Sequence, residues 1–187
     1  MKTKEFLKQH SACKDGAKWA LSISEDMADV WEAMIEQGEH DWLLWIATRP
    51  GVFPDSTVRK LACRFIRETP LSDGRKAWDL LTDERSRKAV EVAEAYTDGK
   101  ATKEELQAAC AAADDAVAAY AADYAVADAA YAAAHAAAAY ATDAAYAAAD
   151  DDVYDAAYDA AYDAAKEAQV RMIAELGNPF KKERTKR

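Results

Sequence analysis

Between Leu106 and Met172 the sequence contains no Leu, Ile, Phe, Met or Trp, and between Lys100 and Leu176 it contains no Gly or Pro. The first absence removes the stripe of large aliphatic residues by which helices usually pack, and the second removes the residues that interrupt helices. More than half of the tract is Ala, the strongest helix former, and most of the remainder is Tyr or Asp. Helix is therefore the only regular structure that this tract favours, and Tyr and Ala must provide its packing.

Residues from which catalytic and metal sites are built are also scarce. The sequence has no GxSxG, no HExxH, no glycine-rich phosphate loop and no zinc-type spacing of Cys and His. The pairs His10 with Cys13 and His40 with Asp41 are too isolated to predict a metal or nucleophile site. We therefore expect no enzymatic activity, no cofactor and no metal.

Three cysteines lie about fifty residues apart without CxxC spacing, at Cys13, Cys63 and Cys110. An odd number of cysteines at such spacing predicts reduced thiols, most of them buried as packing residues, in a cytoplasmic protein. Met1 to His10 is charged and lacks the apolar region of a signal peptide. The only long apolar tract carries many Asp residues, so we expect no contact with a membrane.

Negative charge is concentrated in one part of the chain. The formal net charge is −10, and residues 103–167 contain 14 acidic and two basic residues. Such an acidic body disfavours direct binding to nucleic acids or membranes and favours a basic partner. By contrast, residues 179–187 are basic, and we expect them to form a disordered tail.

The N-terminal hundred residues predict several short amphipathic helices. Their boundaries follow from cap residues and from Gly or Pro. We expect one helix from the N-cap Ser24 to Gly38, one from Glu39 to the Pro50-Gly51 stop, one from Asp55 or Ser56 to before Pro70, a short turn around Trp78 to Leu81, and one from Asp83 to Asp98-Gly99. Four of the five Trp residues lie between Trp31 and Leu81, which predicts the main core there.

The Ala-rich tract opens with a capping-box spacing, Thr102 followed by Glu105. A single helix from there to Leu176 would be about 110 Å long at 1.5 Å per residue. A compact chain of this length has a radius of gyration of about 16 Å, so we expect the tract to fold back. Thr142-Asp143 and Asp150 to Asp152 are the best positions for new helix starts, giving two or three antiparallel helices. One long bent helix is the alternative.

These patterns together predict an all-α protein with a single helical domain over residues 1–178. A Trp-rich core of short amphipathic helices occupies residues 1–100, and long helices rich in Ala, Tyr and Asp, packed antiparallel, occupy residues 102–176.

A stripe of Tyr and Asp residues is the strongest candidate for a functional surface. Tyr and Asp recur every four residues, so each type follows one face of a helix. Tyr offers a rigid amphipathic surface and Asp offers charge, which suits a partner rich in Arg and Lys. The alternative is that Tyr fills an Ala-rich interior while Asp keeps the exterior solvated. The candidate partner-binding residues are Tyr154, Asp155, Tyr158, Asp159, Tyr162, Asp163, Asp150, Asp151 and Asp152.

The adjacent carboxylates of Asp150, Asp151 and Asp152 could also be interpreted as ligands of a metal ion. Adjacent residues on a helix diverge by about 100°, and the spacing lacks the alternation and the glycine of a calcium-binding loop. A helix start or a solvated surface is the better interpretation of Asp150, Asp151 and Asp152.

Several short elements resemble the alanine-rich immunity proteins of bacterial polymorphic-toxin systems. They precede an Ala-rich tail with scattered Tyr and Asp, and the resemblance spans roughly Cys13 to Ala165. The elements are Asp41-Trp42-Leu43-Leu44-Trp45, Ala62-Cys63-Arg64, Arg85-Ser86-Arg87-Lys88-Ala89, Glu94-Ala95 and Gly99-Lys100-Ala101-Thr102 with Glu105-Leu106. The resemblance implies an all-helical cytoplasmic protein that binds and neutralises a toxin, and it implies no catalytic residues.

The sequence thus predicts a non-catalytic inhibitor whose acidic helical face covers a basic toxin or nuclease. One alternative is an inhibitor carried by a phage or mobile element, whose Asp rows mimic nucleic-acid phosphates to block a host defence protein. Another is a structural module that forms a homodimer through its Ala-rich helices. The sequence does not decide whether Arg49, Arg59, Arg64, Arg85 and Arg87 neutralise the acidic face internally.

Overall fold

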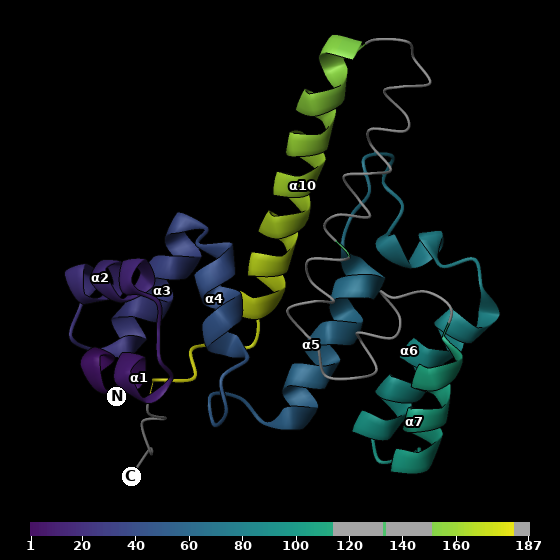
Figure 1. The fold of residues 1–187 in the computed structure, drawn as a ribbon, viewed down its shortest axis with the longest axis horizontal. Helices are drawn as coiled ribbons and strands as arrows, with labels where there is room; N and C mark the ends of the chain where they lie inside the picture. The colour runs from purple at the N-terminus through teal and green to yellow at the C-terminus, as the bar shows by residue number, and fades with distance from the viewer. Residues whose placement is uncertain (114–132, 134–150, 182–187) are drawn as a thin grey trace.

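α-Helices form the regular structure of the part of the chain that the structure describes, residues 1–113, 133 and 151–181 (Figure 1). The structure is a computed structural model. No strand occurs in these ranges, so the all-α prediction is confirmed. The elements are α1 (Thr3–Gln9), α2 (Lys14–Ile23), α3 (Met27–Gln37), α4 (His40–Ala47), α5 (Asp55–Glu68), the 3-10 turn η1 (Ala77–Leu80), α6 (Glu84–Thr97), α7 (Lys103–Ala112) and α10 (Asp151–Ala174).

Local capping signals set most of the helix ends. Gly38 ends α3 at a φ of 69°, a left-handed conformation that glycine adopts without a Cβ penalty. At the start of α7, Thr102 and Glu105 form the predicted capping box, each side chain binding the other residue's backbone N–H. Asp83 likewise caps α6 by accepting from the Arg85 N–H. These ends were predictable because each depends on residues within one turn.

Three details of the N-terminal region differ from the sequence prediction. Asp26, not Ser24, caps α3, because Ser24 is the extended residue that ends α2 and its hydroxyl donates to Asp29. Helix α4 ends at Ala47, with Thr48 as its C-cap, and so stops before the predicted Pro50-Gly51 signal. Helices α1 and α2 were not predicted individually.

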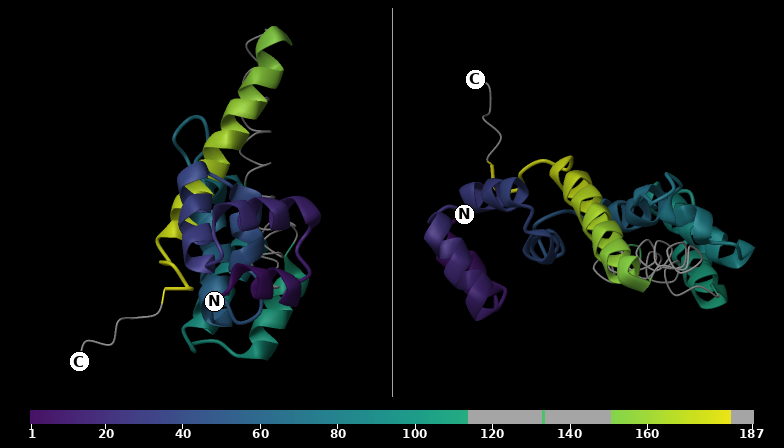
Figure 2. Two further views of the ribbon diagram at one scale, coloured as in Figure 1. Left: turned by 90° about the vertical axis from the view of Figure 1, so that its left-hand side faces the viewer. Right: turned by 90° about the horizontal axis from the view of Figure 1, so that it is seen from above.

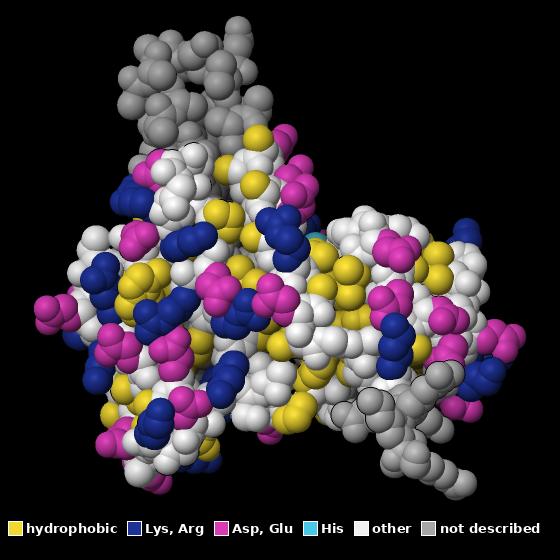
Figure 3. All heavy atoms as spheres, turned by 180° about the vertical axis from the view of Figure 1, so that it is seen from behind, with side chains coloured by type: hydrophobic (Ala, Val, Ile, Leu, Met, Phe, Trp, Pro, Cys, Tyr) yellow, Lys and Arg dark blue, Asp and Glu magenta, His cyan; other side chains and the backbone are white. Residues whose placement is uncertain are grey.

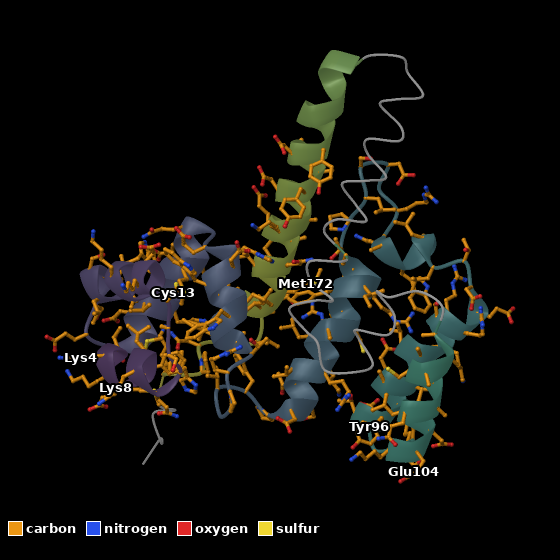
Figure 4. The ribbon with its side chains drawn as sticks, viewed as in Figure 1. Lys4, Lys8, Cys13, Tyr96, Glu104 and Met172 are labelled. Atoms are coloured by element: carbon orange, nitrogen blue, oxygen red, sulfur yellow. The ribbon has the colours of Figure 1, made fainter. Side chains whose placement is uncertain are left out.

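The helices form two groups with α10 between them (Figures 1 and 2). Helices α1 to α4 pack on one another in the first group, and α5, η1, α6 and α7 pack on one another in the second. Helix α10 contacts α3 and α4 on one side and α5 on the other. Met172, near its C-terminal end, lies at this junction (Figure 4). The N-terminal half of α10 rises above the other labelled helices (Figure 1).

One hydrophobic core runs through both groups. It includes the fully buried Trp31 of α3 and Phe65 of α5, and it continues into α10 through Ile173. Trp19, Trp42, Trp45 and Trp78 are partly buried against this core. The prediction placed the core between Trp31 and Leu81, and the structure extends it to Phe6 in α1 and to the C-terminal half of α10.

The Ala-rich tract is not one continuous helix. Helix α7 ends at Ala112 and the backbone is extended at Ala113, where no break was predicted. Helix α10 begins at Asp151, within the run predicted as a helix start. The other predicted break, Thr142-Asp143, lies outside the described residues. None of the helices in the described ranges combines the length and the apolar character that a membrane span requires.

The folded part of the chain reaches further than the predicted boundary at residue 178. Phe180 packs edge-on against Phe6 and Trp31, with ring centroids 5.3 and 6.1 Å apart. Asn178 donates to the Ala28 carbonyl, and Lys181 pairs with Glu32 at 2.8 Å. The start of the predicted tail is therefore wrong, because Phe180 gains burial that an unfolded tail would lack. Residues 182–187 lie outside the described ranges.

The three cysteines differ in environment. Cys63 in α5 is buried as expected, and burial raises the pKa of its thiol to about 12. Cys110 is half-buried. The expectation of burial is wrong for Cys13, which is exposed and caps α2 by accepting from the Gly16 N–H at 3.3 Å.

Replacing Ile173 with Ala should reduce the free energy of unfolding by about 2–5 kcal/mol, because a fully buried side chain between the two groups would leave a cavity. Leu21→Ala is the matched control, since Leu21 is 49% exposed on α2 and its truncation should cost no more than about 0.5 kcal/mol. Urea denaturation followed by circular dichroism measures both. Equal effects would mean that α10 does not contribute to the core.

Alkylation with iodoacetamide at pH 8 should distinguish Cys13 from Cys63. The reactive species is the thiolate, and both burial and the raised pKa keep Cys63 protonated at this pH. Peptide mass spectrometry should show Cys13 modified at least about 100-fold faster than Cys63 in the native protein. The difference should disappear in denaturant. Rapid native modification of Cys63 would contradict its placement in the core.

Candidate functional site

The predicted Tyr and Asp residues that the structure describes occupy different environments on α10. Tyr158 and Tyr162 are half-buried, whereas Asp159 and Asp163 are exposed. Asp151, Asp152, Tyr154 and Asp155 belong to α10 by their backbone, but their side chains lie outside the described part of the structure, and Asp150 lies outside it entirely.

The two tyrosines take part in packing. Their rings stack with centroids 6.0 Å apart and planes 16° apart. Tyr162 packs against Leu71 and Ala165, and the Lys166 ammonium lies 5.3 Å from its ring centroid. Burial raises the pKa of the Tyr162 hydroxyl. These contacts favour the interpretation in which Tyr fills the interior, so we place the tyrosines beneath the candidate surface rather than on it.

The exposed carboxylates of Asp159 and Asp163 form no ion pair with any residue in the described ranges. The arginines that might have neutralised them are engaged elsewhere. Arg49 donates to the Trp45 carbonyl, Arg59 lies over the Tyr96 ring, Arg64 pairs with Glu68 and Glu175, Arg85 pairs with Asp83, and Arg87 donates to the Leu81 carbonyl.

A groove of about 520 Å³ lies between the C-terminal end of α3 and the middle of α10. Its lining includes the carboxylates of Glu36, Asp163 and Glu167. We call these three residues, together with Asp159 one turn further along α10, the acidic groove. A row of acidic side chains is visible along the described part of the projecting helix (Figure 3).

Sequence analysis missed Glu36 and Glu167. Glu167 continues the four-residue spacing of Asp159 and Asp163, so it could have been found by extending the row by one turn. Glu36 could not, because only the contact between α3 and α10 brings it to the same groove.

The backbone adds to the negative character of the groove. Gly38, the residue that ends α3, lies in its lining, so the partial negative charge of the helix C-terminus faces the same space. Two cations also line it. Lys166 pairs with Asp41 at 3.3 Å, and the exposed Arg171 lies 3.7 Å from Glu167. Both cations therefore already have acidic partners, so among the described residues Glu36, Asp159 and Asp163 are the carboxylates of the groove without an ion pair.

A buried polar chain holds α10 at this position. The His40 ring has one nitrogen 2.8 Å from Asp41 Oδ1 and the other 2.7 Å from Gln169 Oε1. The Gln169 amide donates to the Thr69 hydroxyl at 3.4 Å. His40, Gln169 and Thr69 are all buried, so these bonds link α4, α10 and the end of α5 in a medium where unpaired polar groups are costly.

This buried polar chain is suited to positioning α10 rather than to catalysis. Burial opposes ionisation of Asp41, but the hydrogen bond from His40 and the charge of Lys166 outweigh burial and lower the Asp41 pKa. Both ring nitrogens of His40 are held by oxygen atoms within the protein. Within the described ranges, no group of three or more His, Cys, Asp or Glu side chains is arranged to hold a metal ion.

Replacing Gln169 with Ala should lower the free energy of unfolding by about 1–3 kcal/mol, because a buried His40 nitrogen and the Thr69 hydroxyl lose their partner. The matched control is Gln37→Ala, which truncates an exposed amide at the end of α3 and should change stability by no more than about 0.5 kcal/mol. Thermal and urea unfolding measure both. A neutral Gln169→Ala would mean that the polar chain does not hold α10.

Comparison with protein-family models, with curated protein sequences and with solved structures gives no match to this chain. The charge and shape of the acidic groove are therefore the basis on which a ligand can be assigned to it.

Proposed function

We propose that the chain is a non-catalytic binding protein that neutralises a basic protein, such as a toxin or nuclease, by covering part of its surface with the acidic groove. The observation that carries this proposal is the exposure of Asp159 and Asp163 without an ion pair in the described ranges. Like charges four residues apart on a helix repel one another, so a cationic partner would relieve this repulsion by pairing with them.

The geometry of the row suits Arg and Lys side chains from one partner surface. Asp159, Asp163 and Glu167 are one helical turn apart, which corresponds to about 6 Å along α10. Each carboxylate can accept two hydrogen bonds from a guanidinium, and Glu36 faces them from α3. A basic protein would therefore contact a continuous strip rather than a single charge.

The charge distribution also favours rapid capture of a basic partner. Residues 103–167 carry 14 of the 34 acidic residues and two of the 24 basic residues. Such a field raises the association rate with an oppositely charged protein and weakens with salt. The resemblance to immunity proteins supports a toxin as the partner, and the mechanism requires occlusion alone.

Replacing both Asp159 and Asp163 with Asn should weaken binding to the basic partner by about tenfold, since each exposed pair contributes up to about 1 kcal/mol. The fold should be unaffected because neither side chain is paired. The partner is first captured from a lysate on the immobilised wild-type chain at low salt, eluted at high salt and identified by mass spectrometry. The affinities of wild type and variant for the purified partner are then compared.

Asp55→Asn with Glu104→Gln is the matched control, because it removes the same two charges from exposed positions on α5 and α7 that do not line the groove. This control should bind like the wild type. If no basic protein is retained in equimolar amount, or if the two double variants bind equally, the acidic groove is not the binding surface. Elution of the chain itself as a discrete oligomer would favour the self-association alternative.

A further inference from the structure

A second cavity, separate from the acidic groove, lies within the first helix group. It has a volume of about 190 Å³ and is lined by residues of α1 to α4 and the segment before α2. Three of the five Trp residues of the chain, Trp19, Trp42 and Trp45, form part of its wall, and Asp41 supplies a carboxylate. The rest of the lining includes Leu7, Met34 and Ile46. Figure 4 labels Cys13, another lining residue, in this group.

We propose that this cavity binds a small organic cation, an ammonium group carried on an apolar body about the size of a benzene ring. The proposal does not depend on the function of the acidic groove.

The size and lining of the cavity define the apolar body. An apolar cavity of about 150 Å³ is large enough to hold benzene, and the cavity here is slightly larger. Indole, aliphatic and thioether walls favour an apolar ligand that leaves water. Gly16 lets the indole of Trp42 pack close to α2, because a Cβ there would lie 3.2 Å from Cys13 Sγ and 3.5 Å from Trp42 Nε1.

The indoles favour a positive charge on that body. Indole presents the best aromatic face for a cation, and quaternary and alkylated ammonium groups are typically bound between such faces. Trp19 and Trp42 pack on each other, tilted by 50° with ring centroids 5.1 Å apart, and Trp45 lines the same cavity. A cation in the cavity would lie against this indole-rich wall.

Asp41 is the acidic residue in the lining of the cavity. Both of its partners, His40 Nδ1 at 2.8 Å and Lys166 Nζ at 3.3 Å, contact Oδ1. Oδ2 accepts no hydrogen bond from any residue in the described ranges, and the Asp41 side chain is 55% exposed. The lowered pKa of Asp41 keeps the group ionised at neutral pH. The lining of the cavity therefore combines apolar side chains, three indoles and the carboxylate residue Asp41.

Benzylammonium and its neutral counterpart benzyl alcohol test the proposal on the full-length chain. The five indole N–H signals are followed by two-dimensional NMR during each titration. Benzylammonium should shift the signals of Trp19, Trp42 and Trp45 and bind about tenfold more tightly than benzyl alcohol. Trp31 in the core and Trp78 near α5 do not line the cavity, so their signals are internal controls.

Two variants separate charge from shape. Asp41→Asn should reduce the affinity for benzylammonium to that for benzyl alcohol, while the control Asp55→Asn keeps the tenfold preference. Ala12→Leu fills the cavity from its edge and should abolish binding of both compounds. If removing Asp41 disturbs the buried polar chain and the fold, Ala12→Leu still tests the site.

The proposal is overturned if benzylammonium shifts none of the three cavity indoles, or shifts all five signals alike. Equal affinities of the wild type for the two compounds would leave an apolar cavity without cation selectivity and overturn it as well. So would unchanged binding by a folded Ala12→Leu variant, or an unchanged preference in a folded Asp41→Asn variant.

Discussion

The docking of the C-terminal half of α10 between the two helix groups is the constraint on which the rest of the structure depends. Ala165, Gln169 and Ile173 follow one another at four-residue intervals and are all fully buried, so this face of α10 is covered by α3, α4 and α5. Small Ala residues allow close approach, and Gln169 adds hydrogen bonds to His40 and Thr69 in specific directions. Hydrophobic burial supplies the attraction, and these bonds determine the depth and rotation of α10.

The same helix also presents the acidic groove, because Asp163 and Glu167 precede the buried Ala165 and Gln169 by two positions, about 200° around the helix. Fixing Gln169 in the interior places Asp163 and Glu167 beside the end of α3. Some charges elsewhere are paired internally, as in the two-bond contact of Arg67 with Glu94. Asp159 and Asp163, by contrast, have no ion pair with any residue in the described ranges.

Sequence patterns predicted those features that depend on near neighbours. Gly38 and the Thr102 capping box determine helix ends through contacts within one turn, so these boundaries were predictable. The hydrogen bond between His40 and Gln169 joins residues 129 positions apart, so the sequence around either residue does not indicate it. Helix α1 has a similarly long-range basis, since its Phe6 is covered by Phe180 from the other end of the chain. The four-residue spacing of the Asp row could be recognised in the sequence, but the position of Glu36 in the same groove could not.

The cover that Phe180 provides has a consequence for biosynthesis. The chain from Phe6 to Phe180 takes roughly 10–30 seconds to translate at 5–20 residues per second. During that interval Phe6 and Trp31 lack the ring that covers them in the folded protein, and Asn178 has not yet reached the Ala28 carbonyl. The first helix group therefore leaves the ribosome with an incomplete core, which is completed only when the C-terminal segment reaches it.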